Sequence, residues 1–183
     1  MTQSTTKEDQ LILVDEHDKE VGAEGKLSAH QKGLLHRAIS VFIFNKRGEL
    51  MLQKRAKTKY HSAGMWSNTC CSHPRPGEDT ETAARRRLQE EMGFTCDVRH
   101  VHHLLYRTTF PNGLIENEYD HMFVGEYEAD PVLNSEEAED WRWMSPEAIK
   151  EDIAKHPEAY SYWFRLALDD VLQKHAGFLK AIS

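Results

Sequence analysis

The chain has 183 residues, a hydrophobic content of 39% and a formal net charge of −7 at pH 7. That much apolar sequence is enough for one compact α/β domain, so we expect a single domain over residues 1–183, with residues 1–10 flexible. The acidic balance and the lack of a polybasic run argue against a protein that coats nucleic acid. No stretch is apolar enough for a signal peptide or a membrane span, so we expect a cytoplasmic protein with no membrane partner.

Short segments rich in β-branched and aromatic residues predict strands along most of the chain, at residues 11–14, 36–44, 49–54, 95–110, 114–127 and 141–144. The second and third of these flank a turn sequence at residues 45–48, and we expect them to pair as an antiparallel hairpin. A tight-turn sequence at residues 111–113 joins the next two strands. The segment that holds Lys26 and His30 is polar, and we expect it to be irregular.

Helical periodicity is clearest between Asp79 and Gly93. Asp79 or Thr80 can cap the N-terminus, and Gly93 ends the run. An apolar stripe at four-residue spacing is expected to face the core, at Ala84, Leu88 and Met92. Ser145 starts another helix, and residues 159–174 form a C-terminal one. This order of elements fits an α/β/α sandwich around a mixed sheet, with extra terminal elements.

The residues just before the first predicted helix carry reactive side chains. Cys71 and His73 are two apart, so in an extended backbone they point to the same side, whereas Cys70 points away. Three cysteines make a poor disulfide framework, and a cytosolic thiol near several histidines favours catalysis or metal binding. On a later strand, Glu116 and Glu118 share one face for the same geometric reason.

The helix also carries the spacing of the Nudix box, a loop-helix-loop in which glutamates hold divalent cations against a diphosphate. Its matching residues, counted back from Gly93, are Glu91, Glu90, Leu88, Arg86 and Glu78. The chain therefore resembles a Nudix protein, which implies the same α/β/α fold. Two positions depart from the box. Ser72 replaces its first glycine, and Arg87 replaces a glutamate, which removes a metal ligand and adds a phosphate partner.

The chain also contains the run Cys71-Ser72-His73-Pro74. In this it resembles the type 1 isopentenyl diphosphate isomerases, which carry such a run in a degenerate Nudix box. The resemblance covers residues from about 26 to 163. It implies an enzyme of isoprenoid biosynthesis that interconverts isopentenyl and dimethylallyl diphosphates, as a monomer or homodimer. The reaction moves a double bond without redox change, so it needs one acid and one base and no nicotinamide or flavin.

The same resemblance implies two cation sites. Three histidines and two glutamates would hold a transition metal, Mn²⁺ or Zn²⁺, with iron also suited to this ligand set: His30, His36, His73, Glu116 and Glu118. Mg²⁺ on Glu91 would accompany the diphosphate. By composition alone, a histidine at a strand start such as His36 is more often structural, so this ligand set depends on the resemblance.

Catalytic roles are implied in the same way. Glu118, with Tyr106 beside it, would donate the proton, and Cys71 would take one from the opposite face. The ring of Trp163 would face the cationic centre. The diphosphate would be held by basic and hydroxyl side chains, at Lys26, Arg55, Lys59, Ser72 and Arg87. From spacing alone, the two aromatic residues would be core residues, and Arg55 and Lys59 would belong to a solvated strand end.

Two other interpretations stay open. A Nudix pyrophosphohydrolase would use Glu90 and Glu91 to activate water on a nucleoside diphosphate, although Arg87 and the Cys71-Ser72-His73 run speak against it. A module that stores metal or senses nucleotides would keep the fold and bind metal without turnover. Phosphate release identifies the first, and indifference to replacement of Cys71 favours the second.

Overall fold

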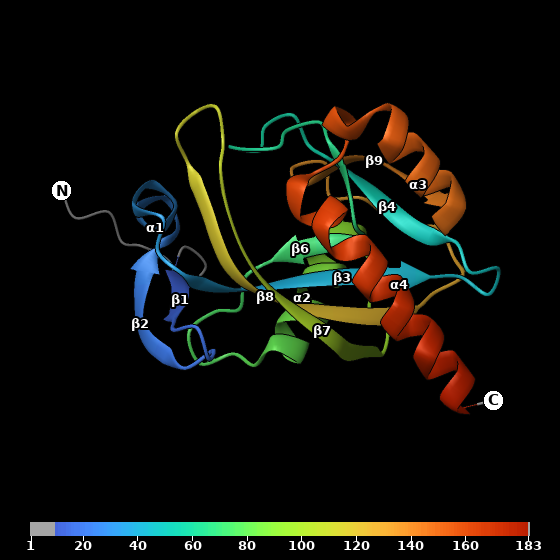
Figure 1. Ribbon diagram of the computed structural model, residues 1–183, viewed down its shortest axis with the longest axis horizontal. Coiled ribbons are helices and arrows are strands. Elements are labelled where there is room, and N and C mark those ends of the chain that lie inside the picture. The colour runs from blue at the N-terminus through green and yellow to red at the C-terminus, as the bar shows by residue number, and fades with distance from the viewer. Residues whose placement is uncertain (1–9, 183) are drawn as a thin grey trace.

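The computed structural model describes residues 10–182, so the flexible segment expected at residues 1–10 lies almost wholly outside the described residues. The strands are β1 (Gln10–Val14), β2 (Glu20–Gly25), β3 (His36–Phe44), β4 (Leu50–Arg55), β5 (Trp66–Ser67), β6 (Cys70–Ser72), β7 (Val98–Thr109), β8 (Ile115–Glu126) and β9 (Ala138–Met144) (Figure 1). The helices are α1 (Lys26–Lys32), α2 (Thr80–Met92), α3 (Pro146–Lys155), a 3₁₀ turn (Pro157–Ala159) and α4 (Tyr162–Ile182).

Strand β3 is the centre of the sheet and is buried on both faces. It pairs in parallel with β8 and antiparallel with β6, so the sheet is mixed. On one face, Val41 packs in a core with Leu88 of α2. On the other, Phe42 packs with Ile149 of α3 and Phe164 of α4. Each such side chain contributes about 1.5–3 kcal/mol by burial. Figure 1 shows α4 crossing one side of the sheet with α2 behind it, which confirms the α/β/α sandwich.

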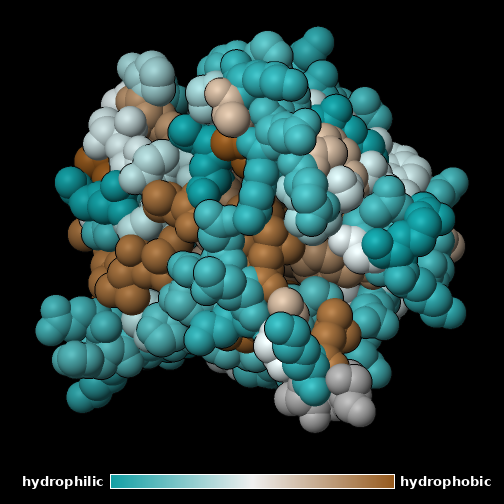
Figure 2. Space-filling model, turned by 45° about the vertical axis from the view of Figure 1, so that its right-hand side comes forward, coloured by the Kyte–Doolittle hydropathy of each residue, from teal (hydrophilic) through white to brown (hydrophobic). Residues whose placement is uncertain are grey.

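One face of the molecule has a largely polar surface (Figure 2). Figure 2 shows hydrophilic residues over much of one face, with apolar residues gathered in patches between them. Among the described residues, the most exposed large apolar side chains are Val132, Val21 and Leu27. No helix within residues 10–182 combines the length and the apolar character that crossing a membrane requires.

Helix α2 has the ends and the buried face that the sequence predicts. The carboxylate of Asp79 caps it by accepting a hydrogen bond from the backbone N–H of Thr82 at 2.9 Å. Gly93 ends it in the left-handed conformation, with φ at 73°. The expected apolar stripe is fully buried, at Ala84, Leu88 and Met92. The helix is therefore fixed in rotation, with its polar side turned to the loop that precedes it.

Replacing Gly93 with alanine is expected to destabilise the fold strongly. A Cβ at Gly93 would lie 2.4 Å from the carbonyl oxygen of Val132, in addition to the strain of a positive φ. Gly113 is a matched control, because it also has a positive φ (83°) but nothing lies within 4 Å of its Cβ position. We expect Gly93→Ala to cost at least about 2 kcal/mol more than Gly113→Ala in urea unfolding. Equal losses of unfolding free energy in the two variants would show that the Val132 segment shifts to accept the new Cβ at no energetic cost.

The predicted antiparallel pairing of β3 and β4 across their turn is confirmed, but it is short. The two strands pair only at Phe44 and Leu50, next to their turn, and then diverge. Strand β6 takes the place of β4 beside β3, while β4 pairs with β5 and β9. The hydroxyl of Thr69 bridges the gap: it donates to the Met51 carbonyl at 2.6 Å and accepts from the Ile43 N–H at 3.0 Å. The sheet therefore opens into a fork, and β6 lies inside it.

Two elements near the N-terminus were not expected. Lys26 and His30 lie on α1 rather than in an irregular segment. This helix has only seven residues, about two turns, so it leaves little periodicity to detect. Strand β2 contains two glycines and pairs with β1 at the sheet edge, where its composition is atypical of a strand. At the other end, α4 begins at Tyr162, after the 3₁₀ turn, rather than at residue 159.

Candidate active site

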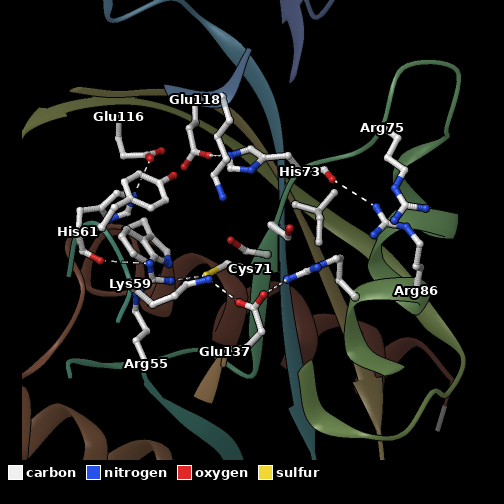
Figure 3. Close-up of a pocket in the computed structure, with 17 residues that line it drawn as sticks. Arg55, Lys59, His61, Cys71, His73, Arg75, Arg86, Glu116, Glu118 and Glu137 are labelled. Atoms are coloured by element: carbon white, nitrogen blue, oxygen red, sulfur yellow. Dashed lines mark hydrogen bonds and ion pairs between the residues drawn. The ribbon is translucent and has the colours of Figure 1, made fainter. Parts of the chain in front are cut away.

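A cavity lies at the fork of the sheet, beside β6, the middle of β3 and the end of β4 (Figure 3). Cations and carboxylates both face it. Its basic side chains are Lys26, Arg55, Lys59, Arg75, Arg86 and Arg87. Its acidic side chains are Glu116, Glu118 and Glu137. Cys71, Ser72, His73 and Trp163 complete the predicted residues that line it. Such a mixture suits an anionic ligand bound beside an acid–base pair.

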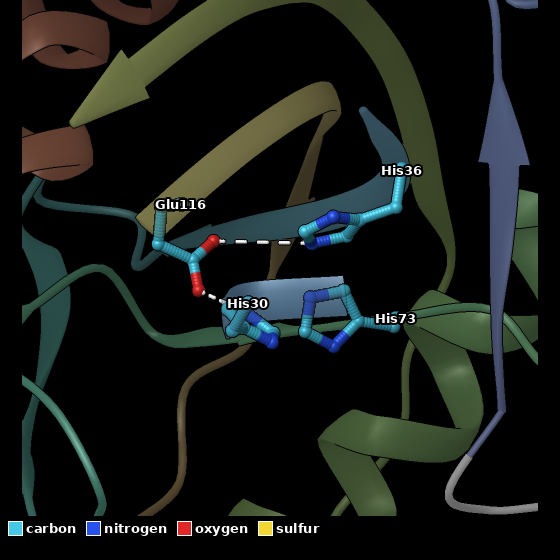
Figure 4. Close-up of side chains that lie close together, drawn as sticks. All are labelled: His30, His36, His73 and Glu116. Atoms are coloured by element: carbon cyan, nitrogen blue, oxygen red, sulfur yellow. Dashed lines mark hydrogen bonds and ion pairs between the residues drawn. The ribbon is translucent and has the colours of Figure 1, made fainter. Parts of the chain in front are cut away.

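Four of the predicted metal ligands meet at one end of this site, although they come from different elements. His30 lies on α1, His36 opens β3, His73 follows β6 and Glu116 lies on β8. Their ligand atoms all lie within 4.8 Å of one another (Figure 4). The fifth predicted ligand, Glu118, is the cross-strand partner of His36 on β8. Its Oε2 lies 3.0 Å from the Nε2 of His73 and 3.5 Å from that of His36.

The backbone sets which nitrogen of each ring faces the cluster. The Nδ1 of His30 lies 2.6 Å from the carbonyl oxygen of Lys26, and that of His36 lies 2.8 Å from the carbonyl oxygen of Leu34. A carbonyl only accepts, so Nδ1 carries the proton and Nε2 faces the carboxylates. The Nε2 of His36 is buried with no hydrogen-bond partner. A divalent cation would satisfy that orphaned atom, so the donor set fits a metal.

The protonation states of His73 and Glu118 also favour ligation. Burial lowers the pKa of His73 to about 4, despite the hydrogen bond to Glu118, so its ring is neutral and able to ligate. Burial would raise the pKa of Glu118, but the nearby rings of His36 and His73 hold that pKa well below the usual value. Glu118 also accepts a hydrogen bond from the hydroxyl of Tyr106. The pKa of Tyr106 is raised well above its usual value, by burial first and then by Glu118, so it stays a donor.

Cys71 faces the same cavity from β6. Cys70, its neighbour, points into the core under α2, as the alternation of an extended strand predicts. The Sγ of Cys71 lies 3.6 Å from Nη1 of Arg55. Burial raises the pKa of this thiol to about 12, although Arg55 opposes the shift. Arg55 is therefore the nearest charge able to favour a thiolate.

Trp163 closes another side of the cavity. Its side chain is buried, and its indole N–H donates to the side-chain oxygen of Asn68 at 3.2 Å. Asn68 is itself held by the carbonyls of Val41 and Cys70, at 3.2 Å and 2.7 Å. The ring is thus oriented from β3 and β6, and the guanidinium of Arg55 lies over it at 5.0 Å.

Comparison with known proteins agrees with this geometry. The model of the NUDIX domain family matches residues 34–166. Isopentenyl-diphosphate Delta-isomerase 2 of Aromatoleum aromaticum is 56% identical over 90% of this chain and 87% of its own length. The isopentenyl-diphosphate Delta-isomerase of Serratia proteamaculans is 46% identical over 90% and 92%. The chain belongs to the isopentenyl-diphosphate Delta-isomerase family of Nudix proteins.

Solved structures support the fold independently of close sequence similarity. A Deinococcus radiodurans protein superposes with a TM-score of 0.71 at 20% identity, over 86% of this chain and 96% of its own. The MutT protein of Methanosarcina mazei Go1 superposes with a TM-score of 0.64, also at 20% identity, over 77% and 95%. At such identities the likeness concerns the fold alone.

The Nudix box of this isomerase-family chain is internally paired. Arg86 donates to both carboxylate oxygens of Glu78 at 2.8 Å and also contacts Glu90. Arg87 donates to Glu90 at 2.7 Å and to Glu91 at 2.6 Å. Glu91, the predicted Mg²⁺ ligand, is buried behind Arg87 and does not line the cavity. Its role as a ligand stays a prediction, which requires Arg87 to move aside.

Among the cavity residues that the sequence interpretation missed, three contact predicted site residues. His61 is buried, its Nε2 lies 2.9 Å from the acceptor Oε1 of Glu116, and its ring stacks on that of Phe110 at a centroid distance of 4.3 Å. Tyr60 lies 3.3 Å from the Nε2 of His30 through its hydroxyl. Glu137 precedes β9 and contacts Lys59 and Arg87. All three lie in loops without periodicity, so no local pattern marks them.

Proposed function

We infer that this protein interconverts isopentenyl and dimethylallyl diphosphates by protonation and deprotonation. The observation that carries the proposal is the arrangement of Glu118 and Cys71. Both line one cavity, from β8 and β6, and its other end is rich in basic side chains. An acid, a base and an anion site are what this rearrangement needs, and membership of the isomerase family supports the same reaction.

The acid side of the proposed reaction is Glu118 with Tyr106. A proton added to the terminal alkene carbon creates a tertiary cationic centre, which requires a strong acid in a site closed to water. The hydrogen bond from Tyr106 and the contacts with His36 and His73 hold this carboxyl in place. A divalent cation bound at the histidines would withdraw electron density from Glu118 and strengthen it as an acid.

The base side is Cys71. Loss of a proton from the carbon next to the cationic centre forms the allylic double bond, so each turnover adds one proton and removes one. The proximity of Arg55 stabilises the thiolate that accepts this proton. In the reverse direction the neutral thiol, which burial favours, would be the donor.

We further propose that the predicted basic residues bind the diphosphate. Lys26, Arg55, Lys59 and Arg87 all line the cavity, with Ser72 among them. Burial lowers the pKa of Lys26, and the neighbouring charge of Lys59 adds to this. Cations that crowd one another in a closed site favour a multiply charged anion. Mg²⁺ on Glu91 would accompany that anion, and Mn²⁺ or Zn²⁺ would occupy the histidine cluster.

The proposed cellular setting follows from the chemistry. Cys70, Cys71 and Cys96 are all free, and a catalytic thiol must stay reduced, which favours the cytoplasm. The product would supply the building blocks of isoprenoid biosynthesis. Whether the protein acts as a monomer or a homodimer stays a prediction.

Incubation with isopentenyl diphosphate and Mg²⁺ tests the proposed reaction. The product should become acid-labile, because only an allylic diphosphate decomposes readily in acid, and no phosphate should be released. Release of phosphate from nucleoside diphosphates without isomerisation would instead support a pyrophosphohydrolase. The pairing of Glu90 and Glu91 with Arg87 speaks against that alternative, because it occupies both carboxylates.

Trp163 allows a finer test of the cationic intermediate. A cation over an aromatic face gains roughly 0.5–2 kcal/mol when water is excluded, and phenylalanine keeps part of this gain where leucine keeps none. We expect Trp163→Leu to turn over about 2- to 30-fold more slowly than Trp163→Phe. Both variants lose the hydrogen bond to Asn68, so that loss cancels in the comparison. Equal rates at matched thermal midpoints would return Trp163 to a packing role.

A further inference from the structure

Glu137 is a carboxylate at the anion-binding end of the cavity that the proposed reaction leaves without a role. Its side chain is 22% exposed. One oxygen contacts Nζ of Lys59, and the other lies 3.2 Å from Nη2 of Arg87 (Figure 3). These are two of the residues proposed to bind the diphosphate. In the absence of substrate, Glu137 thus forms ion pairs with the two cationic side chains that a phosphate group would need.

The backbone holds Glu137 firmly in this position. Its N–H donates to the Asn134 carbonyl at 2.9 Å, and its own carbonyl accepts from the N–H of Ala56 at 3.0 Å. The segment before it is pinned to the end of α2, where the N–H groups of Val132 and Asn134 donate to the carbonyls of Met92 and Glu91. These bonds fix the backbone of Glu137 between α2 and the end of β4, so its carboxylate stays within reach of this end of the cavity when an anion enters.

Arg87 is shared between two carboxylates. Its Nη2 lies 2.6 Å from Glu91 and 3.2 Å from Glu137, which come from different elements. Burial would raise the pKa of Glu137, but Lys59 and Arg87 hold that pKa below the usual value, so the carboxylate is charged. An anion that draws Arg87 and Lys59 to itself leaves two negative groups facing it. A divalent cation carried by the anion would compensate both.

We propose that Glu137 makes the cavity discriminate between magnesium-bound and free diphosphate. Free diphosphate must displace Glu137 from Lys59 and Arg87, and then lies beside a like charge that it cannot neutralise. The magnesium complex brings a dication to the same carboxylate, so the repulsion becomes attraction. Glu137 is therefore a residue that determines specificity for the charge state of the substrate. This inference depends on the proposed diphosphate site, not on the isomerisation chemistry.

Calorimetric titration of inorganic diphosphate tests the inference. Wild type, Glu137→Gln and Glu136→Gln would be compared in buffer with excess Mg²⁺ and in buffer prepared without it. The Glu136 side chain is exposed, does not line the cavity, and is therefore a matched control. We expect the ratio of magnesium-bound to free affinity to fall by at least about tenfold in Glu137→Gln, or ~1.4 kcal/mol, and to stay unchanged in Glu136→Gln.

The direction of the change separates the possible outcomes. Tighter binding of free diphosphate with weaker or equal binding of the magnesium complex supports the proposal. Equal weakening of both forms would show that Glu137 only supports the fold, and an unchanged ratio would also overturn the inference. Absence of diphosphate binding to the wild type would remove its basis. None of these measurements involves the alkene, so a failure of isomerisation is detected separately by the acid-lability assay.

Discussion

Cys71→Ala is expected to lower the rate of isomerisation by at least about 10²–10⁴-fold, because it removes one of the two proposed proton-transfer groups. Arg55 would remain over Trp163, and Cys71 is not among the residues of the histidine cluster, so metal content should not change. The measurement is turnover of isopentenyl diphosphate together with the metal content of the purified variant.

Two further variants make this result interpretable. Cys71→Ser keeps nearly the same shape but offers a hydroxyl, which is a much weaker acid than a thiol, so it should also be inactive. Cys96→Ala removes a half-buried thiol that does not line the cavity, and it should turn over normally. Wild-type turnover by either Cys71 variant would exclude this thiol from proton transfer.

Local signals in the sequence were sufficient for much of the fold. The bounds of β3 and the cap, stripe and end of α2 were predicted correctly, because each depends on residues close together in the chain. The antiparallel pairing of β3 and β4 at their turn was also predicted correctly, but the early divergence of β4 was not, because it depends on competition from β6. Asn68 and Thr69 lie just before strand β6. Their side chains form hydrogen bonds with the backbone of β3 and β4 and hold the fork open. The turn sequence at residues 45–48 carries no information about β6, the strand that competes with β4 for pairing with β3.

Local sequence signals predicted even less of the site, because its contacts join distant parts of the chain. Alternation along an extended strand correctly indicated that Cys71 and Cys70 face opposite sides. The contact between His30 and Glu116 spans 86 positions, so no spacing rule could predict it, and only the family resemblance brought these residues together. His61 lies in the loop between β4 and β5, outside every motif, although it contacts the same carboxylate as His30. The fork and the cavity are therefore tertiary features, and the residues that only they bring together were missed.

Glu116→Gln is expected to remove the transition metal from the protein. Glu116 is the carboxylate that the histidines share: its Oε1 lies 2.5 Å from the Nε2 of His30, and its Oε2 lies 4.0 Å from that of His36. Loss of an outer-shell partner typically costs 10–100-fold in metal affinity, so loss of a charged ligand should cost more than about 100-fold. His73→Ala should have a similar effect, since it removes a ring that is neutral and ready to ligate.

Metal analysis after dialysis, combined with thermal unfolding, distinguishes ligand loss from misfolding. Mn²⁺ that binds only the folded state raises the thermal midpoint, so wild type should be stabilised by added Mn²⁺ and the two variants should not. Glu126→Gln is the control, because it replaces an exposed carboxylate at the other end of β8 and should respond as wild type does. If both variants kept one equivalent of metal and the same midpoint shift, the ion would be held elsewhere. Glu118, the proposed proton donor, would then lack the adjacent cation that the proposed acid strength requires.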